Sequence, residues 1–161
     1  MTKKFLFSLI ALVSISVVFM GCPEDASKTI AQELQKELGG SSVADVDGTT
    51  VTLKAAKTLD KNITVPSGIT LTIKSGTTLT TSTYTLTVKG TLVVQGTLVA
   101  GTATVVGKSG GQVKIETGGV CAATIFYPNG AGAAAAAVAG KTYDWNATAG
   151  GAGTAGWKAN S

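Results

Sequence analysis

The chain repeats a short unit near its middle, as Leu86-Thr87-Val88-Lys89-Gly90-Thr91, Leu92-Val93-Val94-Gln95-Gly96-Thr97 and a shortened Leu98-Val99-Ala100-Gly101-Thr102. Each unit places leucine and a second apolar residue before a Gly-Thr corner. A unit this short cannot bury its apolar side chains alone, so successive units must stack on one another. The repeat therefore predicts a β-solenoid with parallel strand pairing and an interior column of Leu, Val and Ile.

The same character extends from Val51 to Glu116, where apolar residues alternate with threonine and turn signals are frequent. Pro66-Ser67-Gly68 and Lys74-Ser75-Gly76 supply further corners. With on the order of 20 residues per coil, this stretch makes about three or four coils. The competing fold is a β-sandwich, whose strands usually run nearer five or six residues than the roughly two or three allowed here. We expect a mainly β protein with a short parallel β-solenoid over residues 48–118.

This stretch resembles the first coils of right-handed parallel β-helix surface proteins, in which apolar-Thr-apolar strands alternate with Ser-Gly or Gly-Thr corners. It resembles more loosely the six-residue windings of the bactofilin family of polymer-forming proteins. The resemblance is one of pattern. It implies the architecture and says almost nothing about function.

The N-terminus has the pattern of a secreted protein. Lys3 and Lys4 form a positive region, the apolar core runs from Phe5 to Phe19, and Met20-Gly21-Cys22 supplies a small-residue cleavage site. Its end resembles the lipobox of bacterial lipoproteins. Gly21 and Cys22 match that motif, whereas Phe19 and Met20 are larger than its usual residues. The alternative is an uncleaved membrane anchor, but about 15 apolar residues fall short of the roughly 20 that a spanning helix needs.

The lipobox resemblance implies that residues 1–21 are a signal peptide cleaved after Gly21. It also implies that the Cys22 thiol receives a diacylglycerol and that the new amino group is acylated. Two or three acyl chains hold a protein on a membrane more firmly than one, which binds only marginally. Pro23 stands where an aspartate signals inner-membrane retention in some bacteria, so the resemblance favours the outer membrane, on its periplasmic or surface face.

Composition limits the other functions. Without Lys3 and Lys4 the chain keeps 11 of its 13 basic residues against 9 acidic ones, a net charge of +2. The lysines are scattered, arginine is missing and no aromatic residues interleave with the lysines, so no nucleic-acid partner is expected. The sequence contains no histidine for acid-base chemistry or zinc binding. Asp60 and Glu116 are the carboxylates of the β region, and nothing in their spacing indicates a catalytic pair. We therefore expect no enzyme activity, no cofactor and no metal.

Residues 22–47 are interpreted as the lipidated cysteine, a tether and an amphipathic helix. Ile30, Leu34 and Leu38 form the apolar stripe, Thr29 and Gln32 have the spacing of a capping box, and Gly39 is placed to end the helix. This helix is expected to cover one open end of the solenoid. Residues 41–50 are polar and are interpreted as a solvated linker, although Asp45 and Asp47 beside Gly48 also invite a calcium hypothesis.

Residues 119–161 are expected to cap the other end. The section holds five aromatic residues, and its run Ala133 to Ala137 suggests a short helix between Gly132 and Gly140. Two uses are open for Tyr143, Trp145 and Trp157, which are capping the solenoid or stacking on the rings of a glycan. Cys121 lies in an apolar context typical of a buried small side chain rather than a reactive thiol.

One further pattern is the set of Thr-x-Thr triplets, Thr70-Leu71-Thr72, Thr78-Leu79-Thr80 and Thr85-Leu86-Thr87. A flat ladder of these hydroxyls would resemble an ice-binding surface, but threonine is also common on the wet face of any strand. Three functions remain open. They are a lipid-anchored envelope protein with a noncatalytic structural or interaction role, a glycan-binding or adhesin module, and a self-assembling solenoid similar to bactofilins.

Overall fold

The computed structural model describes residues 23–101, 104–123, 125–127, 134–149 and 155–160, with side-chain detail from Asp25 onward. The expected signal peptide, its cleavage site after Gly21 and the lipidation site Cys22 lie outside these residues. The described chain is mainly β. The bounds of its elements, in chain order, are α1 Pro23–Leu38, β1 Ala44–Asp47, β2 Thr50–Leu53, β3 Lys57–Thr58, β4 Ile63–Val65, β5 Thr70–Ile73, β6 Thr78–Thr80, β7 Leu86–Val88, β8 Thr91–Val94, β9 Thr97–Val99, β10 Val105–Gly107, β11 Gln112–Ile115, β12 Val120–Cys121, β13 Phe126–Tyr127, β14 Thr142–Asn146 and β15 Gly156–Ala159.

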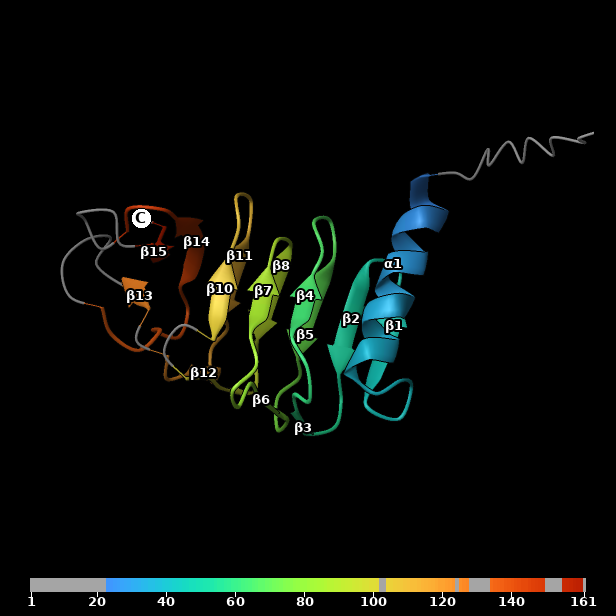
Figure 1. The fold of residues 1–161 in the computed structure, drawn as a ribbon. Coiled ribbons are helices and arrows are strands. Elements are labelled where there is room, and N and C mark those ends of the chain that lie inside the picture. The colour runs from blue at the N-terminus through green and yellow to red at the C-terminus, as the bar shows by residue number, and fades with distance from the viewer. Residues whose placement is uncertain (1–22, 102–103, 124, 128–133, 150–154, 161) are drawn as a thin grey trace, which may run out of the picture.

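The strands form three sheets that wrap around one interior (Figure 1). The long sheet has the order β1-β2-β5-β8-β11-β14-β15-β13, the three-stranded sheet β10-β7-β4 and the four-stranded sheet β12-β9-β6-β3. The three repeat units supply β7, β8 and β9, and each of these strands belongs to a different sheet. One turn of the fold therefore uses three units, with a corner between successive strands.

Strands of successive turns pair in parallel and in a constant register. In the long sheet the pairs Thr50–Thr70, Thr70–Thr91 and Thr91–Gln112 lie 20 or 21 residues apart along the chain. The predicted parallel β-solenoid is confirmed, and it completes about three turns.

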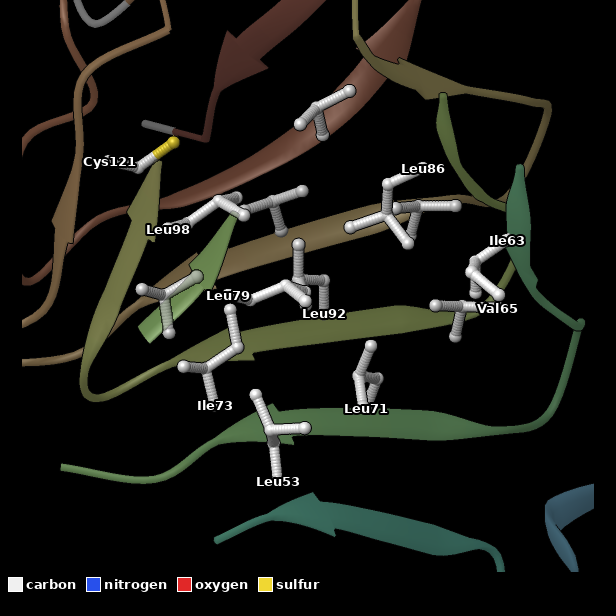
Figure 2. Packing of buried hydrophobic residues seen from close by; sticks show 14 of the residues in the cluster. Leu53, Ile63, Val65, Leu71, Ile73, Leu79, Leu86, Leu92, Leu98 and Cys121 are labelled. Carbon is white, nitrogen blue, oxygen red and sulfur yellow. The ribbon is translucent and has the colours of Figure 1, made fainter. Parts of the chain in front are cut away.

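The interior is built from rows of apolar side chains that stack from turn to turn. The rows are Val51, Leu71, Leu92 and Val113, then Leu53, Ile73, Val94 and Ile115, then Ile63, Leu86 and Val105, and finally Leu79, Leu98 and Cys121. Figure 2 shows side chains from all three sheets meeting in this interior. All of these residues are buried. Each large apolar side chain contributes about 1.5–3 kcal/mol relative to an exposed one, so the stacked rows are the main stabilising feature of the fold.

The corners require glycine because successive turns approach closely there. A Cβ added to Gly90, Gly96, Gly111 or Gly119 would lie closer than 3.0 Å to a backbone carbonyl oxygen of the preceding turn. None of these four residues has a positive φ. Gly90 and Gly96 of the repeat are thus required by the close approach of two backbones and not by an unusual dihedral angle, whereas a Cβ at Gly101 would meet only the Thr104 side chain at 3.4 Å.

The N-terminal end is covered by α1, which crosses the end of the solenoid and contacts β1, β2 and β4 (Figure 1). Ala31, Leu34 and Leu38 form its buried stripe, whereas the predicted stripe residue Ile30 is 38% exposed. The spacing of three and four residues keeps the buried side chains on one helix face. The helical cap itself is confirmed.

Two details of the predicted helix start are wrong. Because α1 begins at Pro23, Thr29 lies inside the helix, and its hydroxyl donates to the carbonyl oxygen of Asp25 at 2.9 Å. It therefore makes no capping box, and the residues from Pro23 onward, interpreted from the sequence as a tether, already belong to the helix. The predicted helix end is correct. Gly39 follows α1 with φ +124°, a value that L side chains rarely adopt.

The linker interpretation of residues 41–50 is also wrong, because this segment contains β1. β1 pairs antiparallel with β2 across a turn at Gly48 and Thr49. Gln35 Nε2 of α1 donates to the carbonyl oxygen of Ala44 at 2.7 Å, which ties the helix to this strand. The antiparallel strand ends the long sheet on the N-terminal side and so protects its edge.

The C-terminal end is covered by β14, β15 and β13, which extend the long sheet beyond β11. β14 pairs antiparallel with β11 and β15. The expected C-terminal cap is confirmed, but the expected alanine helix is wrong for the described residues 134–140. There Ala135 forms a β-bridge with Phe126, and Ala137 N–H donates to the carbonyl oxygen of Cys121 at 3.1 Å. Ala133 lies outside the described residues.

Candidate functional site

Two of the three predicted stacking residues are part of the cap's core. Tyr143 and Trp157 are fully buried, and both pack against Phe126, with ring centroids 4.9 Å and 6.2 Å from it. Trp157 Nε1 donates to the carbonyl oxygen of Val105 at 3.1 Å, which fastens the cap to the last turn of the solenoid. Tyr143 and Trp157 therefore have no exposed ring face for a sugar, and capping is their role.

The Tyr143 hydroxyl is likewise used inside the protein. It accepts a hydrogen bond from Val138 N–H at 2.7 Å. Burial raises the pKa of this phenol above its ordinary value of 10.0. The group is a structural anchor for the segment that precedes β14.

Trp145 differs from these residues because its side chain is only partly buried. It sits opposite Trp157 in the β14–β15 pair, and the two rings meet edge to face with centroids 5.0 Å apart. Its other neighbour is the backbone of Gly107, where an added Cβ would clash with the indole ring. Trp145 is thus held between β15 and β10 at the C-terminal end of the solenoid.

A hollow of about 470 Å³ opens beside Trp145. It is lined by residues of β10 and the segment after it, and by residues of the cap, which are Val106, Gly107, Lys108, Ser109, Trp145, Ala147 and Ala155. We call it the Trp145 hollow. Lys108 is the charged residue of this lining, and it forms no ion pair within the part of the chain that the structure describes.

The hydrogen-bonding state of the two tryptophans also differs. Trp157 uses its indole N–H internally, whereas no hydrogen bond joins the Trp145 indole N–H to another described residue. A partly exposed tryptophan whose indole N–H has no partner among the described residues presents both a flat apolar surface and a hydrogen-bond donor. This combination suits a ligand with an apolar face and hydroxyl or carboxylate oxygens at its edge.

Gly107 is the residue of this site that the sequence interpretation missed. In register it follows Val65 and Val88 along the three-stranded sheet, so it occupies a position that faces the interior. A glycine at an inward position where the preceding turns carry valine signals the close approach of another group. Here that group is the Trp145 ring.

The Thr-x-Thr triplets do not form one ladder. They lie in β5, β6 and the β7 region, and these three strands belong to three different sheets. The observed rows run instead across turns, as in Thr50, Thr70 and Thr91 on the outside of the long sheet. The triplets therefore face three directions and form no single flat surface, in agreement with the interpretation of these threonines as ordinary residues of the wet strand face.

The carboxylates considered for catalysis pair with nearby lysines. Asp60 lies 3.0 Å from Lys57 Nζ, and this lysine lowers the pKa of the carboxyl group below its usual value. Glu116 lies 2.8 Å from Lys114 Nζ. Asp45, from the calcium hypothesis, pairs with Lys54 at 2.6 Å. Within the described ranges no cluster of three or more potential metal ligands occurs.

Comparison of the chain with family models, curated proteins and solved structures finds no match. Among the described residues, no helix has the length and apolar character needed to cross a membrane. The N-terminal motif of the sequence and the Trp145 hollow are the features of the chain that bear on its function.

Proposed function

We propose that the chain is a lipid-anchored protein of the bacterial cell envelope, with a noncatalytic structural or interaction role. The observation that carries the proposal is the N-terminal pattern that ends in Gly21-Cys22. In the sequence this cysteine directly precedes Pro23, the first residue of α1. A lipid on Cys22 would be attached to the N-terminus of α1, which packs against β1, β2 and β4 at the end of the solenoid. Such a connection holds the domain near the membrane surface.

The test is acylation of the full chain in a bacterial host. Wild type should incorporate labelled palmitate and enter the detergent phase, and Cys22→Ala should do neither. Cys121→Ala is the matched control, because it removes the other cysteine of the chain. Labelling that survives Cys22→Ala would overturn the lipid anchor.

For location we propose the outer membrane, supported by Pro23 after the acylated cysteine. Protease treatment of intact cells, compared with cells whose outer membrane is permeabilised, distinguishes its two faces. Cleavage on intact cells places the domain on the surface. Protection until permeabilisation places it in the periplasm.

Glycan binding through the C-terminal aromatics is the second candidate function. The observation that favours it is the partly exposed Trp145 ring at the edge of a hollow, with an indole N–H that no other described residue accepts. A polysaccharide pull-down should retain wild type and lose Trp145→Ala. Tyr84→Ala is the matched control, since Tyr84 is 36% exposed and lies in a turn between β6 and β7.

Self-assembly through the solenoid ends is the third candidate, and the caps argue against it. α1 and β1 cover one end, and β13, β14 and β15 cover the other, so end-to-end strand pairing of the long sheet would require both caps to move. We expect the detergent-solubilised chain to sediment as one species at all concentrations. Sedimentation of larger species as the protein concentration rises would support self-assembly instead.

A further inference from the structure

The Trp145 hollow combines three features that lie on different elements. Trp145 belongs to β14, Gly107 ends β10, and Lys108 and Ser109 form the following turn. β10 is held by its parallel pairing with β7. The hydrogen bond from Trp157 Nε1 to the carbonyl oxygen of Val105 joins the cap to β10. The hollow thus lies where the last turn of the solenoid meets the cap, and strand residues and the residues that follow strands both contribute to its lining.

The described lining of the Trp145 hollow carries charge of one sign, which is positive. It contains Lys108 and no acidic residue. The nearest carboxylate in the sequence to Trp145 is Asp144, which alternates to the other face of β14 and accepts a hydrogen bond from Gln112 Nε2 at 2.9 Å. An ammonium that pairs with no carboxylate of the described residues, beside a tryptophan, favours a ligand that is anionic at its edge.

From these observations we propose that the Trp145 hollow binds an acidic sugar, such as a uronate residue of a polysaccharide. The apolar face of the pyranose stacks on the exposed part of the Trp145 ring. The carboxylate of the sugar forms an ion pair with the Lys108 ammonium. The Trp145 indole N–H and the Ser109 hydroxyl donate hydrogen bonds to oxygen atoms of the sugar ring. This inference rests on the glycan-binding candidate and names its ligand class.

The test compares two probes that share one ring and differ in charge, polygalacturonate and its methyl ester. Binding to the purified full chain in detergent is measured by titration calorimetry, at low and at high salt. Wild type should bind polygalacturonate more tightly than the ester, and added salt should remove much of the difference because it screens an exposed charge.

Variants separate the two contacts. Lys108→Gln should weaken binding of polygalacturonate about fivefold and leave the ester unchanged, as expected for an exposed ion pair. Trp145→Ala should weaken both probes by about tenfold or more, in line with stacking on an aromatic ring. Lys74→Gln, at an exposed corner away from the hollow, is the matched control for charge and should change neither.

Trp145→Ala could also disturb the cap, so Trp145→Phe is included. It keeps a stacking ring but lacks the indole N–H, and it should bind more weakly than wild type while unfolding at a similar temperature. Equal binding of both probes by wild type would overturn the acidic preference while the glycan-binding candidate stands. Binding of neither probe would overturn the uronate site, and the palmitate-labelling test decides the lipid anchor separately.

Discussion

The corner glycines allow one prediction to be worked through in detail. The change is Gly96→Ala, at the corner between β8 and β9. A Cβ at this position would meet the carbonyl oxygens of both Lys74 and Thr77 closer than 3.0 Å, whereas ordinary contacts are 3.4–4 Å. The corner would have to move by more than 0.4 Å, the difference between these limits, away from two backbone atoms that cannot rotate aside.

That movement strains hydrogen bonds on both sides of the corner. Gly96 N–H donates to the carbonyl oxygen of Ile73 at 3.0 Å, and Val120 N–H donates to the carbonyl oxygen of Gly96 at 2.9 Å. Overpacking costs about 1–3 kcal/mol, and each lost hydrogen bond adds about 1 kcal/mol. We therefore expect Gly96→Ala to lower the free energy of unfolding by about 3–5 kcal/mol.

The control is Gly76→Ala, at a corner with φ +78° and no atom within 4 Å of an added Cβ. Its cost comes from the left-handed backbone alone, about 1–2 kcal/mol. Urea unfolding of both variants, followed by circular dichroism, measures the difference. If Gly96→Ala were no more destabilising than Gly76→Ala, close approach of successive turns would not be the reason for glycine in the repeat.

Three further predictions concern the interior and the cap. Trp157→Phe should lower the free energy of unfolding by about 1–3 kcal/mol, because the buried carbonyl of Val105 loses its donor; urea unfolding measures this, and an unchanged midpoint would contradict it. Leu92→Ala should cost about 2–5 kcal/mol, whereas Thr91→Ala, on the outside of the same strand, should cost much less when both are unfolded in parallel. Burial raises the pKa of the Cys121 thiol from 9.0 to about 11, so the unfolded state loses this proton first and stability should fall between about pH 9 and pH 11. Cys121→Ala should reduce that slope in unfolding experiments across this range, and an identical slope in both proteins would refute the assignment.

The solenoid could be predicted from the sequence because the residues that specify it lie close together in the chain. Leucine, a second apolar residue and a Gly-Thr corner recur in each unit from Leu86 to Thr102, and a unit this short has one way to bury its side chains, which is to stack. Ile30, Leu34 and Leu38 likewise keep a helical spacing that indicates a covering helix, although the structure buries Ala31 in place of Ile30. The caps at both ends follow from the same requirement, since a short solenoid must protect its open edges.

The candidate site could be predicted only in part, because burial depends on distant neighbours. Trp145 and Trp157 are both aromatic residues of the C-terminal section, yet Trp157 is buried over Val105 while Trp145 remains partly exposed beside Gly107. Lys108 becomes part of the site through the register of the three-stranded sheet and the turn that follows it.

The sequence by itself determined the repeat, its parallel stacking, the covering helix and the motif at Cys22, because each depends on residues close together in the chain. The tertiary structure alone decided which sheet each Thr-x-Thr triplet joins, since that depends on where the corners fall around a turn. It also decided that the segment with Asp45 and Asp47 forms an edge strand, because such a polar strand needs β2 beside it to pair its backbone. The Trp145 hollow was also decided by the tertiary structure alone. Its lining includes residues of β10 and β14, which are far apart in the chain and come together only when the cap packs on the last turn of the solenoid.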